Sequence, residues 1–201
     1  MPFPTDSTWP AGLLTIFEIC RREQPPLENR YYGPYNKLLS YCFNPNTFEY
    51  FITQHSLPNT SSSHDTLDSI VFVVVYDARR RPLLIADIQD DSWADRANLR
   101  LKADAHMRQY YDAMLADCPI PRLWGLSLLG TSLRVYCGDV HSGQLQPEFE
   151  NRPSRNHTLP RGFLLGSWSM DILSQEGFTK MQAIVADILA NVAALRRDEL
   201  G

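Results

Sequence analysis

Two acidic residues and a glutamine are expected at one end of a pair of apolar strands. Asp68 precedes an aliphatic run at 70–76, and Asp87 and Gln89 lie near the end of a second run at 82–89. Continuous apolar runs of this length are typical of strands that are buried on both faces. A carboxylate in such a strand needs compensation, because burying an unpaired charge is costly. The compensation could come from a divalent cation, from a nearby Lys or Arg, or from water at the strand ends.

The side-chain period of a strand predicts that the three polar residues share one face. An antiparallel hairpin about residues 78–81 sets Ile70 opposite Gln89, or opposite Asp87 if the register shifts by two. In both registers Asp68, Asp87 and Gln89 emerge on the same side, since opposed residues share a face and strands alternate with period two. The hairpin therefore predicts that Asp68 and Asp87 converge on one site.

Composition limits the classes of protein that this chain can belong to. A length of 201 residues without an internal repeat fits one domain with a substantial core. The net charge of −4 argues against tight, sequence-independent binding of nucleic acid, although it leaves room for a local basic patch. The four cysteines are widely spaced and form no CxxC pair, so neither a zinc ribbon nor a redox motif is expected.

The N-terminal segment and the hydropathy pattern bear on the compartment. The segment MPFPTDSTWP is not basic and no clean apolar run follows it, so no secretory signal is expected. The chain also lacks an apolar run of about 18 residues, so no membrane span is expected. We expect an intracellular protein, cytoplasmic or nuclear, with reduced thiols and no membrane association; the oligomeric state is open.

Periodicity predicts the remaining elements and the fold class. Apolar stripes at helical spacing predict four helices, and shorter apolar runs predict five strands. The order predicts a mixed α+β (α/β) domain over 1–201, with a single central mixed sheet flanked by helices. Residues 1–33 would form an N-terminal helical extension, and 139–167 would be irregular. The predicted helices are 12–23, 34–43, 93–117 and 174–197, and the predicted strands are 47–55, 70–76, 82–89, 122–130 and 131–138.

The core order of helix, three strands, helix and strand resembles the PD-(D/E)XK nuclease superfamily, also called restriction-endonuclease-like. The positions that match its signatures are Asp68, the triplet Asp87-Ile88-Gln89, and the helical segment from His106 to Tyr110. The segments KADAHMRQYY, RLWGLSLLGTSLRVY and SWSMDILS are also similar to a large set of fungal proteins of unknown function. The resemblance covers roughly residues 34–197.

This resemblance implies metal-assisted hydrolysis of DNA or RNA phosphodiesters. Asp68 and Asp87 would hold Mg²⁺ or Mn²⁺, Gln89 would orient the attacking water, and His106 and Tyr110 would position the substrate. The superfamily more commonly has a Lys at the position of Gln89, and an amide brings no positive charge to the transition state. The alternative is therefore a catalytically inactive copy of the fold that binds a partner, such as a protein. An enzyme of unrelated chemistry in the same cleft is a third possibility.

Each candidate residue also has a structural interpretation. Asp68 could begin a strand, and Asp87 could pair with Lys102 or Arg108 of the following helix. His106 and Tyr110 share a helix face with core residues, which is typical of packing. Among the neighbouring charged residues, Asp90 and Asp91 are expected to be solvated at the exit of the strand, and Arg79, Arg80 and Arg81 at the hairpin turn.

Overall fold

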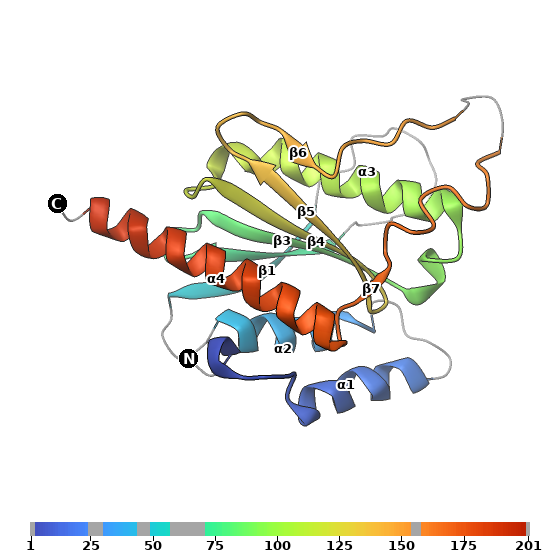
Figure 1. Cartoon of the computed structure of the whole chain (residues 1–201), viewed down its shortest axis with the longest axis horizontal. Coiled ribbons are helices and arrows are strands. Elements are labelled where there is room, and N and C mark those ends of the chain that lie inside the picture. The colour runs from blue at the N-terminus through green and yellow to red at the C-terminus, as the bar shows by residue number, and fades with distance from the viewer. Residues whose placement is uncertain (1–2, 24–29, 44–48, 57–70, 154–157, 200–201) are drawn as a thin grey trace.

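The computed structural model of the chain describes residues 3–23, 30–43, 49–56, 71–153 and 158–199. Asp68 and Ile70 therefore lie outside the described residues, and so does most of the polar loop predicted at 56–66. Figure 1 shows a single twisted sheet with helices on both of its faces. This arrangement confirms the predicted fold class, a mixed α+β domain built on one mixed sheet.

The sheet places three antiparallel strands beside a parallel crossover. Strands β1, β2 and β3 form a meander, β3 and β4 run parallel, and β5 returns antiparallel to β4. Two short strands, β6 and β7, pair with opposite ends of the outer edge of β5. The bounds are β1 Tyr50–Ser56, β2 Val71–Asp77, β3 Pro82–Gln89, β4 Arg122–Leu129, β5 Ser132–Asp139, β6 Leu145–Gln146 and β7 Met170–Asp171.

The helices cover the two faces of the sheet unequally. Helix α3, Ala97–Met114, connects β3 to β4 and packs against both strands. Its approach is close, because a Cβ added at Gly125 of β4 would lie only 2.5 Å from Met107 Cε. Helix α2, Tyr32–Phe43, and helix α4, Gln175–Asp198, lie on the opposite face, and α1, Ala11–Arg22, packs on α2 (Figure 1).

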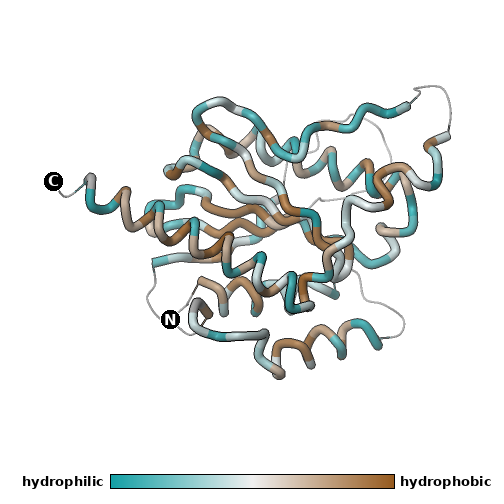
Figure 2. The backbone as a smooth tube through the Cα atoms, viewed as in Figure 1, coloured by the Kyte–Doolittle hydropathy of each residue, from teal (hydrophilic) through white to brown (hydrophobic). Residues whose placement is uncertain are grey.

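Burial of the middle strands explains their apolar sequences. Residues 82–88 of β3 are all buried, since β2 and β4 flank this strand and helices lie over both faces. Figure 2 shows the hydrophobic colouring concentrated in these strands and on the inner sides of the helices. The buried stripe of α4 consists of Phe178, Met181, Ile184, Val185, Ile188 and Val192. The core is therefore continuous across the central strands, and a charged residue within β3 is exceptional.

The structure corrects the predicted start of one helix. A helix was predicted over 93–117, but α3 begins at Ala97 and 3₁₀ turns lie at Asp91–Trp93 and Leu115–Asp117. The Asp90 side chain accepts from the Ser92 backbone N–H and caps the first of these turns. The segment 139–167, predicted as irregular, also contains the two residues of β6.

Helix α4 is long and apolar enough over Gln175–Arg197 to cross a membrane by length and composition, and it is the one such helix in the described part of the chain. In this structure its apolar stripe packs on the sheet. Amphipathic core helices satisfy the same test of length and hydropathy.

Candidate functional site

Asp87 lies in a transverse row of the sheet on the face that α3 covers. The strand registers set Phe72 of β2 on one side of Asp87 and Ser127 of β4 on the other, and Arg134 of β5 follows Ser127. Asp87 and Ser127 are completely buried, and Arg134 is 8 % exposed. Three polar residues therefore occupy adjacent positions beneath α3, in strands that are otherwise mainly apolar.

Neighbouring side chains fill only part of the hydrogen-bonding capacity of the Asp87 carboxylate. Gln89 Nε2 donates to Asp87 Oδ1 at 2.8 Å. The second oxygen, Oδ2, lies 3.8 Å from His106 Nδ1, and both atoms are buried without a hydrogen-bond partner among the described residues. Because buried polar groups are nearly always hydrogen-bonded in folded proteins, a carboxylate oxygen and an imidazole nitrogen left facing each other indicate a site rather than packing.

Aromatic side chains enclose this pair of groups. The Tyr110 ring stacks on Phe72 with centroids 3.9 Å apart, and the Trp93 ring lies 6.0 Å from that of His106. The Tyr110 hydroxyl is buried without a hydrogen-bond partner within the described residues. Burial, followed by the nearby charge of Asp87, raises the pKa of Tyr110 well above its usual value. Tyr110 therefore stays neutral and is a hydrogen-bond donor.

Tyr32 is a site residue that the sequence did not indicate. It begins α2, far from Asp87 along the chain, yet burial and then the charge of Asp87 raise its pKa above the ordinary range. Its proximity arises because the chain entering α2 meets the end of β3, where Arg30 and Tyr31 both contact Asp91. No local pattern around Tyr32 could have indicated this proximity.

The structure brings together four of the five predicted site residues. Asp87, Gln89, His106 and Tyr110 are neighbours, whereas Asp68 lies outside the described residues. Phe72 lies opposite Asp87, which is the pairing implied by the register that sets Ile70 opposite Gln89. The hairpin prediction is therefore confirmed over its described part, and the convergence of the two acids stays a prediction.

Neither of the two ion pairs predicted for Asp87 is found among the described contacts. The Arg108 guanidinium donates to Asp104, four residues before it, at 2.8 and 3.2 Å. Lys102 lies with its ammonium 5.5 Å from the centroid of the Trp93 ring. Within the described residues, the basic side chain nearest to the Asp87 carboxylate is His106, whose Nδ1 lies 3.8 Å from Oδ2.

The expectation that Asp90 and Asp91 are merely solvated was wrong. Arg30 Nη2 lies 3.0 Å from Asp90 Oδ2 and 2.8 Å from Asp91 Oδ2, and the Tyr31 hydroxyl donates to Asp91 at 2.5 Å. Gly130, with φ +61°, allows this approach, because a Cβ there would lie 1.5 Å from the Asp91 carboxylate. These contacts fix the end of β3 immediately after Gln89.

The donor atoms at the site suit a divalent cation in part. Asp87 Oδ2 is a carboxylate oxygen without a hydrogen-bond partner within the described residues, and Mg²⁺ is commonly held by one or two carboxylates and several waters. Within the ranges that the structure describes, no group of three His, Cys, Asp or Glu side chains could hold a metal ion. The described residues thus offer one carboxylate and one imidazole, and a second acid would have to come from the segment that contains Asp68.

Comparison with known proteins gives no relative: no family model, no curated protein and no solved structure matches the chain.

Proposed function

We propose that this chain is a PD-(D/E)XK nuclease-like protein that hydrolyses nucleic-acid phosphodiesters at Asp87 with the help of a divalent cation. The observation that carries the proposal is the Asp87 carboxylate, which is fully buried near the carboxyl end of the central strand β3 with one oxygen lacking a hydrogen-bond partner within the described residues. The element order α2-β1-β2-β3-α3-β4, with β3 and β4 parallel, supports the resemblance noted in the sequence.

The side chains around Asp87 suit defined roles in such a reaction. Gln89 fixes one oxygen of Asp87, so the other oxygen faces the site. His106 Nδ1 faces the unpartnered oxygen and can donate or accept a hydrogen bond there, according to its tautomer. The neutral Tyr110 hydroxyl can donate to a phosphate oxygen or to water. Lys102 contacts the ring of Trp93 one helical turn before His106 and brings positive charge to the same side of α3.

Mg²⁺ or Mn²⁺ would be held by Asp87 and Asp68. When bound, the ion would polarise the phosphate and lower the pKa of its water. The chain's own contribution is a buried enclosure of aromatic side chains, and low solvent access strengthens electrostatic interactions with a charged phosphate.

One observation favours the alternative, a catalytically inactive binding module. Gln89 uses its amide N–H on Asp87 instead of supplying the positive charge that a Lys would bring. In that case the enclosure around Asp87 would be a remnant, and the surface of the fold would bind a protein or nucleic acid.

A cleavage assay separates these two functions. Single- and double-stranded DNA and RNA are incubated with the protein in Mg²⁺, in Mn²⁺ or in EDTA. The proposal predicts metal-dependent cleavage that Asp87→Asn abolishes, together with a metal-dependent rise in Tm that the same variant loses, since a ligand of the native state stabilises it.

Two further variants sharpen this assay. Asp112→Asn makes the same substitution at an exposed position of α3 and should cleave like wild type. Gln89→Lys should increase cleavage if the site lacks only a positive charge. If wild type and Gln89→Lys both cleave none of the substrates, and neither metal shifts the Tm of wild type, the nuclease proposal is wrong. The catalytically inactive binding module is then the favoured function.

A further inference from the structure

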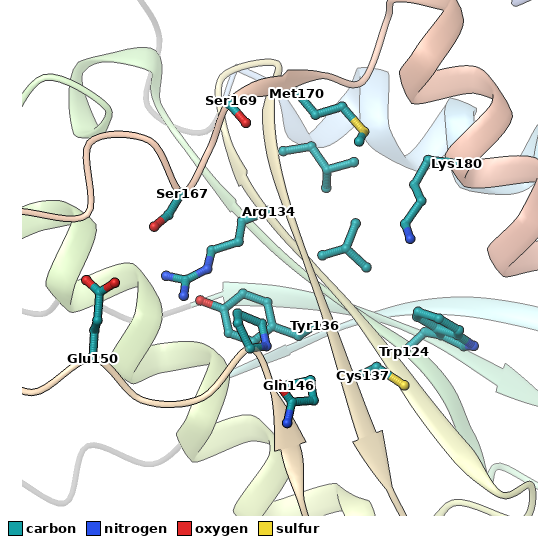
Figure 3. A pocket seen from close by; sticks show the side chains of 13 residues that line it. Trp124, Arg134, Tyr136, Cys137, Gln146, Glu150, Ser167, Ser169, Met170 and Lys180 are labelled. Atoms are coloured by element: carbon teal, nitrogen blue, oxygen red, sulfur yellow. The ribbon is translucent and has the colours of Figure 1, made fainter.

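The outer edge of β5 is uncovered between its two short partners. Strand β7 pairs with Ser132 and Leu133, and β6 pairs with Cys137 and Gly138, which leaves the span 134–136 without a strand partner among the described ladders. A cavity of about 610 Å³ opens at this gap (Figure 3). Its size falls in the range of sites for small molecules.

The cavity has two halves, because successive residues of β5 point to opposite faces of the sheet. Arg134 and Tyr136 face the side of α3, together with the loops that carry Glu150 and Ser167 (Figure 3). Val135 and Cys137 face the side of α4. Trp124 and Lys180 lie in that second half, where Lys180 lies 5.9 Å from the Trp124 ring.

Arg134 is buried without the hydrogen bonds that such a group requires. Its side chain is 8 % exposed, and within the described residues it donates no hydrogen bond; Nη1 is buried and unpartnered although it lies 3.2 Å from Asp104 Oδ1. Its guanidinium lies 5.1 Å from the ring centroids of Tyr136 and Trp168. A guanidinium has five N–H donors, and leaving those of the buried Nη1 without a hydrogen bond is unfavourable.

Arg100 shows how this protein satisfies a buried arginine that has a purely structural role. Its guanidinium, 1 % exposed, donates to the backbone carbonyls of Ala94, Arg161 and Phe163. Within the described residues Arg134 has no backbone carbonyl acceptor and only the Asp104 carboxylate beside Nη1, although it faces α3, the helix that carries Arg100. Arg134 therefore has donors available to an acceptor that the described residues do not supply.

The local charge balance points to an anion as that acceptor. Asp104 is the carboxylate beside Arg134, but it already accepts from Arg108 Nε and Nη2 and from the Tyr136 hydroxyl. Two guanidinium groups thus share one carboxylate, which leaves an excess positive charge at the floor of the cavity. Glu150 at the exposed rim opposes this charge only from solvent.

We propose that the Arg134 half of this cavity binds a small molecule that carries a phosphate or carboxylate group. Arg134 receives the oxyanion through its planar N–H groups, Ser167 supplies a hydroxyl on the adjoining wall, and the rest of the molecule lies along the uncovered edge of β5. Arg134 is two strands from Asp87 in the same row, about 10 Å at ordinary strand spacing. The site is therefore a neighbour of the proposed catalytic centre and does not depend on hydrolysis there.

The test titrates the protein in EDTA with inorganic phosphate or acetate, against chloride at equal ionic strength, by calorimetry and by Tm. Wild type should bind at least one of the two oxyanions and gain Tm over chloride. Stronger binding of phosphate would indicate a phosphate ester as the ligand, and stronger binding of acetate would indicate a carboxylate. Equal Tm in all three salts without binding heat would overturn the proposal.

The variants separate a built site from general attraction of anions. Arg134→Gln should weaken binding by about tenfold or more, and Glu150→Gln should strengthen it by roughly twofold to fivefold. Lys180→Gln removes a charge of the same sign from the other half and should change binding by less than about twofold. If Arg134→Gln fails to fold, Ser167→Ala takes its place and should weaken binding by about threefold or more. Equal losses in the Lys180 variant and in the Arg134 or Ser167 variant would overturn the proposal.

Discussion

Two buried carboxylates at the interface between α3 and the sheet differ in how completely they are satisfied. Asp104, 1 % exposed, accepts from two nitrogens of Arg108 and from the Tyr136 hydroxyl. Asp87, fully buried, accepts from Gln89 alone among the described residues and leaves one oxygen facing His106. Asp104 belongs to α3 and Asp87 to the strand beneath it, and both are buried, so their difference reflects the partners that the sequence supplies and not their depth.

Asp104 therefore stabilises the fold, whereas Asp87 is only tolerated by it. The cluster around Asp104 joins α3 to β5 and, through the bond from Arg108 to the Pro147 carbonyl, to the segment after β6. Within the described residues the cluster around Asp87 makes no comparable connection, and its buried atoms that lack a hydrogen-bond partner there cost free energy. Such a cost at a single point of an otherwise well-packed core is typical of a site that a ligand completes.

The largest effect is expected at Asp104. Asp104→Asn leaves two guanidinium groups beside an amide, and removing one partner of a buried ion pair destabilises proteins by about 3–5 kcal/mol. Urea unfolding followed by circular dichroism measures the loss. A change below about 1 kcal/mol would show that Asp104 is no better satisfied than Asp87, and the contrast between the two clusters would fail.

The tyrosines of both clusters are expected to lower the free energy of unfolding at alkaline pH. Burial raises the pKa of Tyr110 and of Tyr136 well above the usual value, with further increases from Asp87 and Asp104 respectively. Because the folded-state pKa is raised, the contribution of each phenol to the free energy of unfolding is fully present below pH about 10 and declines as the pH rises beyond it. Each phenol should contribute about 1.4 kcal/mol per pH unit to the decline, so either Tyr→Phe variant should reduce the slope of unfolding free energy above pH 10.

The hydroxyl groups of the same two tyrosines should differ at neutral pH. Tyr136→Phe removes a bond of 2.7 Å to Asp104 and should cost about 1.5–3 kcal/mol. Tyr110→Phe removes a buried hydroxyl that has no partner within the described residues and should leave stability unchanged or raise it by up to about 1 kcal/mol. Because the substitution is identical, the difference in urea midpoint reports on the hydroxyl partners alone.

Much of the fold and part of the site followed from local pattern. The bounds of β3 agree with the apolar run at 82–89, and α3 follows the stripe through Ala103, Met107 and Tyr110 apart from its first turn. Asp87, Gln89, His106 and Tyr110 meet because the helix that follows β3 packs back over it, as crossover connections require. Hydrophobic periodicity and the order of elements therefore suffice to predict contacts between elements that are adjacent in the sequence.

The features that the sequence could not indicate depend on contacts between residues that are far apart in the chain. Asp104 and Arg108 have the spacing of an ordinary pair on an exposed helix face, and only the arrival of Tyr136 from β5 makes the pair a buried cluster. The gap on the edge of β5 exists because β6 and β7 are two residues long, too short to leave a pattern. Arg134 therefore carried no signal that would single it out within the strand predicted at 131–138, and neither did the cavity beside it.

The smallest effect on stability is expected at Asp87, and it is the most informative. Asp87→Asn removes a buried charge while an amide oxygen can still accept from Gln89, so the free energy of unfolding should change by less than about 1 kcal/mol. In wild type Mn²⁺ or Mg²⁺ should raise the Tm, and in Asp87→Asn it should not. A loss as large as that of Asp104→Asn would mean that Asp87 has partners of equal strength and that its second oxygen is not available to a ligand. Near-neutral stability combined with a lost metal response would leave Asp87 as an acid whose partner is supplied from outside the fold.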